Sequence, residues 1–169
     1  SYDFPNIMAG KINPFSSLNF YEIGKDDSIL LNNLEEYEIK VLNSEGKVVK
    51  RILKEYEAVR ITEEDKKEIM DKLPAEASMV KDMIEFPKVF PPYRGFSLDD
   101  QGRMFVETFE KGKNKGEFFY DVFDADGNYI AKVPIKGELQ VWKGKKLYAV
   151  EETEDGFQVL KCYSVRWER

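Results

Sequence analysis

The 169-residue sequence contains no histidine, and this absence excludes whole classes of chemistry within the chain. Serine-histidine and cysteine-histidine catalysis, imidazole general bases and His-ligated zinc or iron sites all need a residue that is missing. Cysteine is nearly absent as well. Cys162 is the single example, so no intrachain disulfide can form. Because it alternates with apolar residues in "FQVLKCYSV", we expect it to be a buried small hydrophobe.

Long apolar runs are also missing, and none approaches the roughly 20 residues that span a bilayer. The net charge of −6 has the wrong sign for binding nucleic acid or an anionic membrane. Lys111, Lys113 and Lys115 form one local basic cluster, which predicts a solvated hairpin tip or, alternatively, a contact patch. What is present, 42% hydrophobic and 14% aromatic residues, is enough for one domain with a sizeable core.

Short strand-like segments follow one another along most of the chain. Apolar residues alternate in them, most clearly Tyr37, Ile39 and Val41, and alternation is the mark of a half-buried strand. Turn signals separate the segments. We predict strands at 18–23, 28–33, 37–43, 47–53, 94–100, 103–109, 117–124, 128–135, 138–142, 146–152 and 157–165.

The segments repeat. Superposing Gly46 on Gly127 aligns "YEIKVLNSEGKVVKRI" with "FFYDVFDADGNYIAKV", and Leu139 and Leu147 lie 43 residues after Phe96 and Met104. Four short strands with a period near 43 are typical of propeller blades. We therefore predict an all-β partial β-propeller of about three four-stranded antiparallel blades with one short helical insert. The predicted units are an N-terminal extension (1–17), blade 1 (18–53), helical insert and return (54–92), blade 2 (93–135) and blade 3 (136–169).

The insert holds the predicted helix, "ITEEDKKEIMDKL". Thr62 is the expected N-cap with Asp65 three residues on, and Pro74 is the expected stop. A short apolar stripe on this helix predicts packing against the blades or, alternatively, a partner-binding helix.

Three stretches resemble bacterial six-bladed β-propeller proteins related to NHL repeats: "LDDQGRMFV", "VFDADG" and "LYAVEETEDGFQVLKCY". The likeness covers nearly all of residues 18–165. It implies radial four-stranded blades, a place outside the cytoplasm, in the periplasm or on the cell surface, and a ligand or protein bound on one face. Such motifs specify a fold far better than a function.

Only about three blades are visible, whereas a six-bladed ring needs roughly 260 residues at this repeat length. The third blade also lacks an outermost strand. We expect either the C-terminal half of a propeller or a three-blade chain that closes a ring as a homodimer. Residues 1–17, which include Phe15, could cover the flank of an end blade or pair with the third blade.

The Asp-rich turn "DADGNYIAKVPI" departs from a calcium loop, because Gly stands at position 4, Ile at position 12 and strands flank it. Similar turns recur around Gly46 and Gly156. We expect hairpin turns with left-handed Gly, against the alternative of a weak surface calcium site. No metal or other cofactor is predicted.

The loops that enter the innermost strands predict a ligand or partner site on the axial face, formed by Tyr93, Arg94, Lys136 and Glu138. The alternative is that Tyr93 packs on the preceding prolines while Arg94 is solvated. The expected function is a non-catalytic binding or scaffolding module for a protein, small molecule or carbohydrate, without nucleic acid or membrane insertion. A carboxylate-based hydrolase or lyase, completed by further blades or a second copy, is the alternative; no catalytic residue is assigned.

Overall fold

Alternating strands joined by short turns pair with their neighbours along the chain, and the computed structural model shows three such antiparallel meanders. It describes residues 11–16, 20–33, 35–74, 81–153 and 155–167. The first sheet contains β1 (Tyr21–Ile23), β2 (Ile29–Asn33), β3 (Glu38–Leu42) and β4 (Val48–Leu53). The second contains β5 (Gly95–Leu98), β6 (Met104–Lys111), β7 (Glu117–Phe123) and β8 (Tyr129–Lys136). The third contains β9 (Glu138–Lys143), β10 (Lys146–Glu152) and β11 (Gln158–Ser164).

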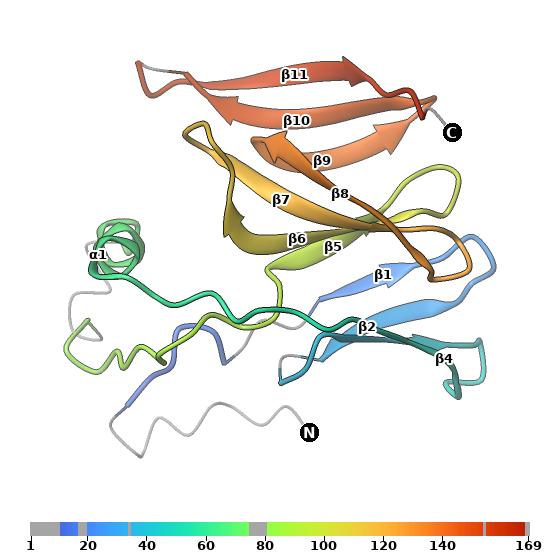
Figure 1. Cartoon of the computed structure of the whole chain (residues 1–169), viewed down its shortest axis with the longest axis horizontal. Coiled ribbons are helices and arrows are strands. Elements are labelled where there is room, and N and C mark those ends of the chain that lie inside the picture. Colours follow the sequence, from blue (N-terminus) through green and yellow to red (C-terminus); the bar gives the residue numbers. More distant parts are fainter. Residues whose placement is uncertain (1–10, 17–19, 34, 75–80, 154, 168–169) are drawn as a thin grey trace.

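The three sheets stack as layers, with the second sheet in the middle (Figure 1). Strand β7 shows how one strand serves both neighbours, because successive side chains point to opposite faces. Phe123 belongs to the core between the first and second sheets, together with Ile39 and Val106. Tyr120 and Val122 belong to the core between the second and third sheets. The predicted fold class, an all-β partial propeller with one short helix, is confirmed, and the third sheet has three strands in the described part of the chain.

The predicted Gly turns are confirmed. Gly46, Gly127 and Gly156 all adopt left-handed φ values, of 76°, 81° and 80°. Each turn is closed by the residue three positions before its glycine: the carbonyl of Asp124 accepts from the Gly127 amide at 2.9 Å. The Asp124 carboxylate accepts from the Asn128 amide at 2.8 Å and from its side chain at 3.1 Å. Hairpin closure therefore accounts for the acidic residue that suggested a calcium loop.

Helix α1 (Glu63–Asp71) begins at the predicted N-cap Thr62, and Thr62 and Asp65 form a reciprocal capping box. Asp65 is buried and accepts from Lys111 Nζ at 2.6 Å, which ties the helix to the end of β6. Lys111 therefore joins the helix to the second sheet, in addition to standing next to the exposed β6–β7 turn. No helix in the described ranges is long and apolar enough to cross a membrane.

Two expectations are corrected. Cys162 is exposed, because β11 is the last strand of its sheet in the described chain and no layer covers its outer face. Phe15 does not cover an end sheet. It is buried against Phe90 and Phe109, whose rings stack at 4.2 Å, and so belongs to the insert region beside the second sheet. Residues 1–10 and 17 of the predicted extension lie outside the described residues.

Candidate functional site

One end of the sheet stack, which we call the insert face, gathers the long connections. It carries the β2–β3 and β6–β7 turns, the β8–β9 link and the segment between β4 and β5 that includes α1 (Figure 1). Within that segment, Arg60 bridges to Val89, and Phe90 donates to the Val59 carbonyl at 2.9 Å. Connections of this kind carry binding residues more often than the strands they join.

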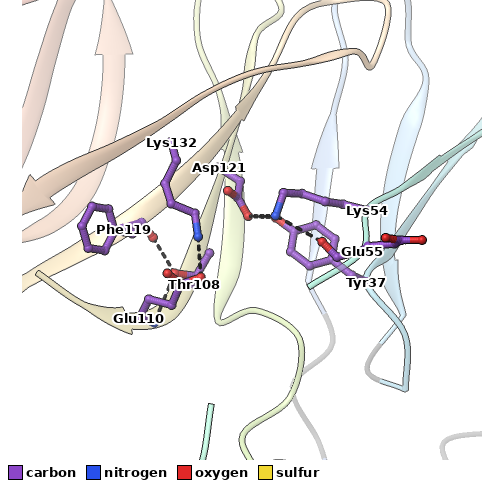
Figure 2. Close-up of polar contacts among 8 residues, drawn as sticks. All are labelled: Tyr37, Lys54, Glu55, Thr108, Glu110, Phe119, Asp121 and Lys132. Carbon is purple, nitrogen blue, oxygen red and sulfur yellow. Dashed lines mark hydrogen bonds and ion pairs between the residues drawn. The ribbon is translucent and has the colours of Figure 1, made fainter. Parts of the chain in front are cut away.

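The centre of the insert face is a buried polar contact between two sheets (Figure 2). Tyr37, directly before β3, donates its hydroxyl to Asp121 Oδ2 at 2.8 Å. Lys54, directly after β4, places Nζ 3.2 Å from the same oxygen. Tyr37 is 3% exposed and Asp121 is 1% exposed. The carboxylate of β7 is thus reached by two groups from the first sheet.

Burial and the neighbouring Asp121 charge together raise the pKa of the Tyr37 phenol far above its usual value. The phenol therefore stays protonated and acts as a donor. Lys54 Nζ also lies 5.3 Å from the ring centroids of both Tyr37 and Tyr129, so an ammonium group is held by two aromatic faces and one carboxylate. Asp121 Oδ1 is buried and has no hydrogen-bond partner within the described structure.

A second ion pair lies beside this contact, between Lys132 of β8 and Glu110 of β6, at 2.5 Å (Figure 2). Burial lowers the pKa of Lys132, but the hydrogen bond to Glu110 and the charge of Asp121 outweigh it, and the net pKa is raised. Thr108 is buried and donates to the Phe119 carbonyl at 2.8 Å. These contacts fix the wall of the site on the second sheet.

Two hollows meet at Tyr37 and Tyr56. The smaller has a volume of about 10 Å³ and is lined by Thr108, Glu110 and Asp121 together with Glu57, Val59, Pro91, Pro92 and Phe109. The larger is an open cleft of about 620 Å³. Its other lining residues are Glu35, Glu36, Leu53, Lys54 and Glu55. The site is thus a tyrosine-lined cleft with acidic walls beside a small cavity at a buried carboxylate, and Tyr37 and Tyr56 line both.

Of the residues predicted to bind a ligand, Tyr93 lies in the core. It is 0% exposed, its ring centroid is 5.1 Å from that of Tyr37, and its hydroxyl donates to the Glu38 carbonyl at 2.8 Å. The Tyr93 hydroxyl oxygen also accepts from the backbone amide of Asn33 at 3.1 Å. Tyr93 is therefore hydrogen-bonded on both sides. Its side chain offers no surface to a ligand in this structure, because packing and backbone hydrogen bonds use all of it.

Arg94 is partly exposed and is held by the second sheet. Its guanidinium lies 2.8 Å from Glu107 and 4.3 Å from the Phe118 ring centroid. Lys136 lies 3.5 Å from the buried Glu151 of the third sheet, whereas Glu138 is exposed at the start of β9. The predicted set is therefore spread over two ion pairs, a core position and an exposed strand start.

The alternative of a carboxylate enzyme needs two acids that converge in a hollow. Burial raises the pKa of Glu107 and outweighs the lowering by Arg94 and by the Tyr120 hydrogen bond, and the charge of Glu138 adds to the rise. Neither acid lines the two hollows described above, and of the acids that line the small cavity, Asp121 is ion-paired with Lys54 and Glu110 with Lys132. Within the described ranges, no group of three or more Asp, Glu or Cys side chains is placed to hold a metal ion.

No family model and no curated protein matches the sequence. Among solved structures, a member of the DUF4221 family from Bacteroides vulgatus is similar, with 14% sequence identity and a TM-score of 0.48. The match covers 87% of this chain and 46% of the other, so the chain spans about half the length of that protein.

Sequence reasoning missed Asp121, although a signal was present. In "EFFYDVF" it stands between Phe119 and Phe123 on one face of a strand that is apolar on both faces. A carboxylate at such a position needs a partner from another element, and here the partners are Tyr37 and Lys54.

Proposed function

We propose that the chain is a non-catalytic scaffolding and binding module, and that its first and third sheets stack against the sheets of a second copy. The observation that carries this proposal is the apolar outer face at each end of the stack. Among the described residues, both faces of the middle sheet are covered, whereas each end sheet is covered on one face only. Several exposed apolar side chains on one face of this kind mark association sites.

The outer face of the first sheet is defined by its register. Ile23, Ile29, Leu42 and Val48 lie in one row across β1, β2, β3 and β4. Ile23 is 64% exposed and Val48 is 51% exposed. Tyr21 is 68% exposed and begins the next row on this face, which continues through Leu31 to Lys40 and Arg51. An apolar row of this kind faces a neighbouring sheet in the interior of a propeller.

The outer face of the third sheet has the same character. Val141, Tyr148 and Cys162 lie in one row across β9, β10 and β11, and Val150 and Leu160 lie in the row after it. Leu160 is 67% exposed and Val141 is 51% exposed. Strand β11 also presents an unpaired edge among the described strands, which could receive a strand from a partner.

The proposed partner is a second copy because the surfaces continue an arrangement that this chain already uses twice. In a two-fold pair, the third sheet of each copy would stack on the first sheet of the other, and the ring would contain six sheets. The resemblance to six-bladed propellers related to NHL repeats supports this number. It also implies a place outside the cytoplasm, which fractionation of cells that make the natural protein would test.

Sedimentation velocity across micromolar concentrations tests the proposal. We expect a reversible dimer, and we expect Ile23→Lys and Leu160→Lys to shift it toward monomer. Phe157→Lys is the matched control, because Phe157 is 70% exposed but lies in the turn before β11. Cys162 gives a second readout, since its reaction with a thiol reagent should slow as the dimer forms. A monomer at every concentration, with constant Cys162 reactivity, would overturn the proposal.

A further inference from the structure

We infer that the cleft at Tyr37 and Tyr56 binds a primary ammonium group at the end of an alkyl chain, as in a lysine side chain or an aliphatic diamine. The nitrogen would enter the small cavity toward Asp121, and the alkyl chain would lie along the tyrosines. This site is on the insert face, and all of its lining residues come from one copy, so it does not depend on dimerisation.

The charge of the cleft selects a cation. Three glutamates, Glu35, Glu36 and Glu55, line the open part, and Lys54 is the single basic residue in that lining. The charge of Lys54 is already matched by Asp121 at 3.2 Å. The net negative field of the walls therefore attracts cations and repels anions.

An acidic wall alone would not define a site, but Asp121 is an independent observation. Its side chain is 1% exposed, it lines the small cavity, and Oδ1 has no hydrogen-bond partner within the described structure. A buried carboxylate oxygen without a donor is costly. An ammonium group supplies the donor that Oδ1 lacks, while Oδ2 keeps its contacts with Tyr37 and Lys54.

The chain itself stabilises an ammonium group at this place. Lys54 Nζ lies 5.3 Å from two tyrosine ring centroids and next to Asp121 Oδ2. Tyr56 lines both the cavity and the cleft, and its ring is 38% exposed, so one aromatic surface remains open to a ligand. Aromatic faces beside a carboxylate are the surroundings that bind cationic groups in proteins.

The size of the cavity makes the inference specific. A volume of about 10 Å³ admits a group as small as one water molecule. A terminal ammonium is of that size, whereas the planar guanidinium of arginine is larger. We therefore expect lysine to be preferred over arginine.

The test uses the whole chain and NMR titration at low salt, with Nα-acetyl-lysinamide and 1,4-diaminobutane as probes. We expect both to shift the amide signals of Thr108, Glu110 and Tyr56. Nα-acetyl-norleucinamide, which has the same four-carbon side chain without the ammonium group, and Nα-acetyl-argininamide should bind at least about threefold more weakly. If 1,4-diaminobutane binds and Nα-acetyl-lysinamide does not, the site is assigned to free diamines rather than to lysine side chains of peptides. Equal binding of the neutral probe or of the arginine probe would overturn the inference.

Variants separate the site from general electrostatics. Glu35→Gln with Glu36→Gln should weaken the lysine probe about three- to tenfold. The matched control is Glu45→Gln with Asp126→Asn, which removes two exposed acids from the turns at the opposite end of the sheets. Asp121→Asn should abolish the shifts at Thr108 while the fold persists by near-UV circular dichroism. If Asp121→Asn does not fold, the two double variants decide, and equal losses in both would overturn the inference.

Discussion

Tyr37 and Asp121 are 84 residues apart in sequence, and the buried Tyr37 hydroxyl donates to Asp121 Oδ2 at a distance of 2.8 Å. The contact joins the start of β3 to the middle of β7, and it therefore links the first sheet to the second. Apolar packing alone does not fix how far one sheet slides over another, because it is non-directional. A buried hydrogen bond to a carboxylate fixes the relative position of the two sheets, because it forms only at a particular distance and angle.

Removing this hydroxyl should weaken the fold. We expect Tyr37→Phe to lower the free energy of unfolding by about 1–3 kcal/mol, because a buried carboxylate loses a donor while the ring stays in place. Urea unfolding followed by tryptophan fluorescence measures the change. Tyr56→Phe, at a partly exposed ring in the same cleft, should change stability by less than about 0.5 kcal/mol. Equal effects of the two substitutions would show that the buried contact contributes little.

The buried phenols should make the protein sensitive to alkali. Burial raises the pKa of Tyr93 to about 12, and burial with nearby acidic charge raises the pKa of Tyr37 and Tyr120 further. A raised pKa in the folded state means that stability is complete below the unfolded value of about 10 and is lost as pH rises above it. Each tyrosine should contribute a slope of up to about 1.4 kcal/mol per pH unit.

Urea unfolding at a series of pH values above and below the normal tyrosine pKa measures this slope. Replacing one of the three tyrosines by Phe should reduce the slope of the unfolding free energy against pH by the contribution of one titrating group. The absorbance of tyrosinate gives an independent check, since the exposed tyrosines should titrate first. Complete titration of all tyrosines in the folded protein at their ordinary pKa would contradict the prediction.

The sheets could be predicted because their signals are local. Alternation places a residue such as Ile39 on one face, and Gly46 and Gly127 mark turns that require positive φ. The helix start was equally readable, because the Thr62 cap needs only residues within one turn. Exposure of Cys162 could not be predicted in this way. Alternation gives the face of a strand, whereas burial depends on whether another layer covers that face.

The candidate site could be predicted only in part for the same reason. The loop position of Arg94 suggests a binding residue, but the register between β5 and β6 is what places Glu107 beside it. Tyr93 was singled out as a surface aromatic, whereas its hydroxyl satisfies backbone groups of the first sheet. The relation of Tyr37 to Asp121 depends on how two sheets stack, and no local pattern in the sequence contains that information.

The helix should loosen when its buried ion pair to β6 is removed. Lys111 Nζ lies 2.6 Å from Asp65 Oδ1, and Asp65 is 6% exposed. Burial raises the pKa of Asp65, but the hydrogen bonds from Lys111 and Thr62 outweigh it, and the net pKa is lowered. We expect Lys111→Met to speed hydrogen exchange of α1 while the sheets keep their protection, because a buried charge loses its partner. Lys113→Met, in the exposed turn, is the control, and unchanged exchange in α1 would contradict the prediction.

Two turn glycines with the same backbone conformation should respond differently to alanine. Gly46 has φ 76° and a Cβ added there would meet no atom within 4 Å. Gly127 has φ 81°, and its Cβ would lie 2.9 Å from Cγ1 of Ile52 in the first sheet. Both substitutions incur the left-handed penalty of about 1–2 kcal/mol. Gly127→Ala should cost about 1–3 kcal/mol more, because it also overpacks the contact between two sheets.

Urea unfolding of the two variants, and of Gly127→Ala combined with Ile52→Ala, measures the difference. The combined variant should lose less than the sum of the single losses, since removal of the Ile52 side chain relieves the clash. Equal losses for Gly46→Ala and Gly127→Ala would show that the turn at Gly127 does not press on the first sheet in solution.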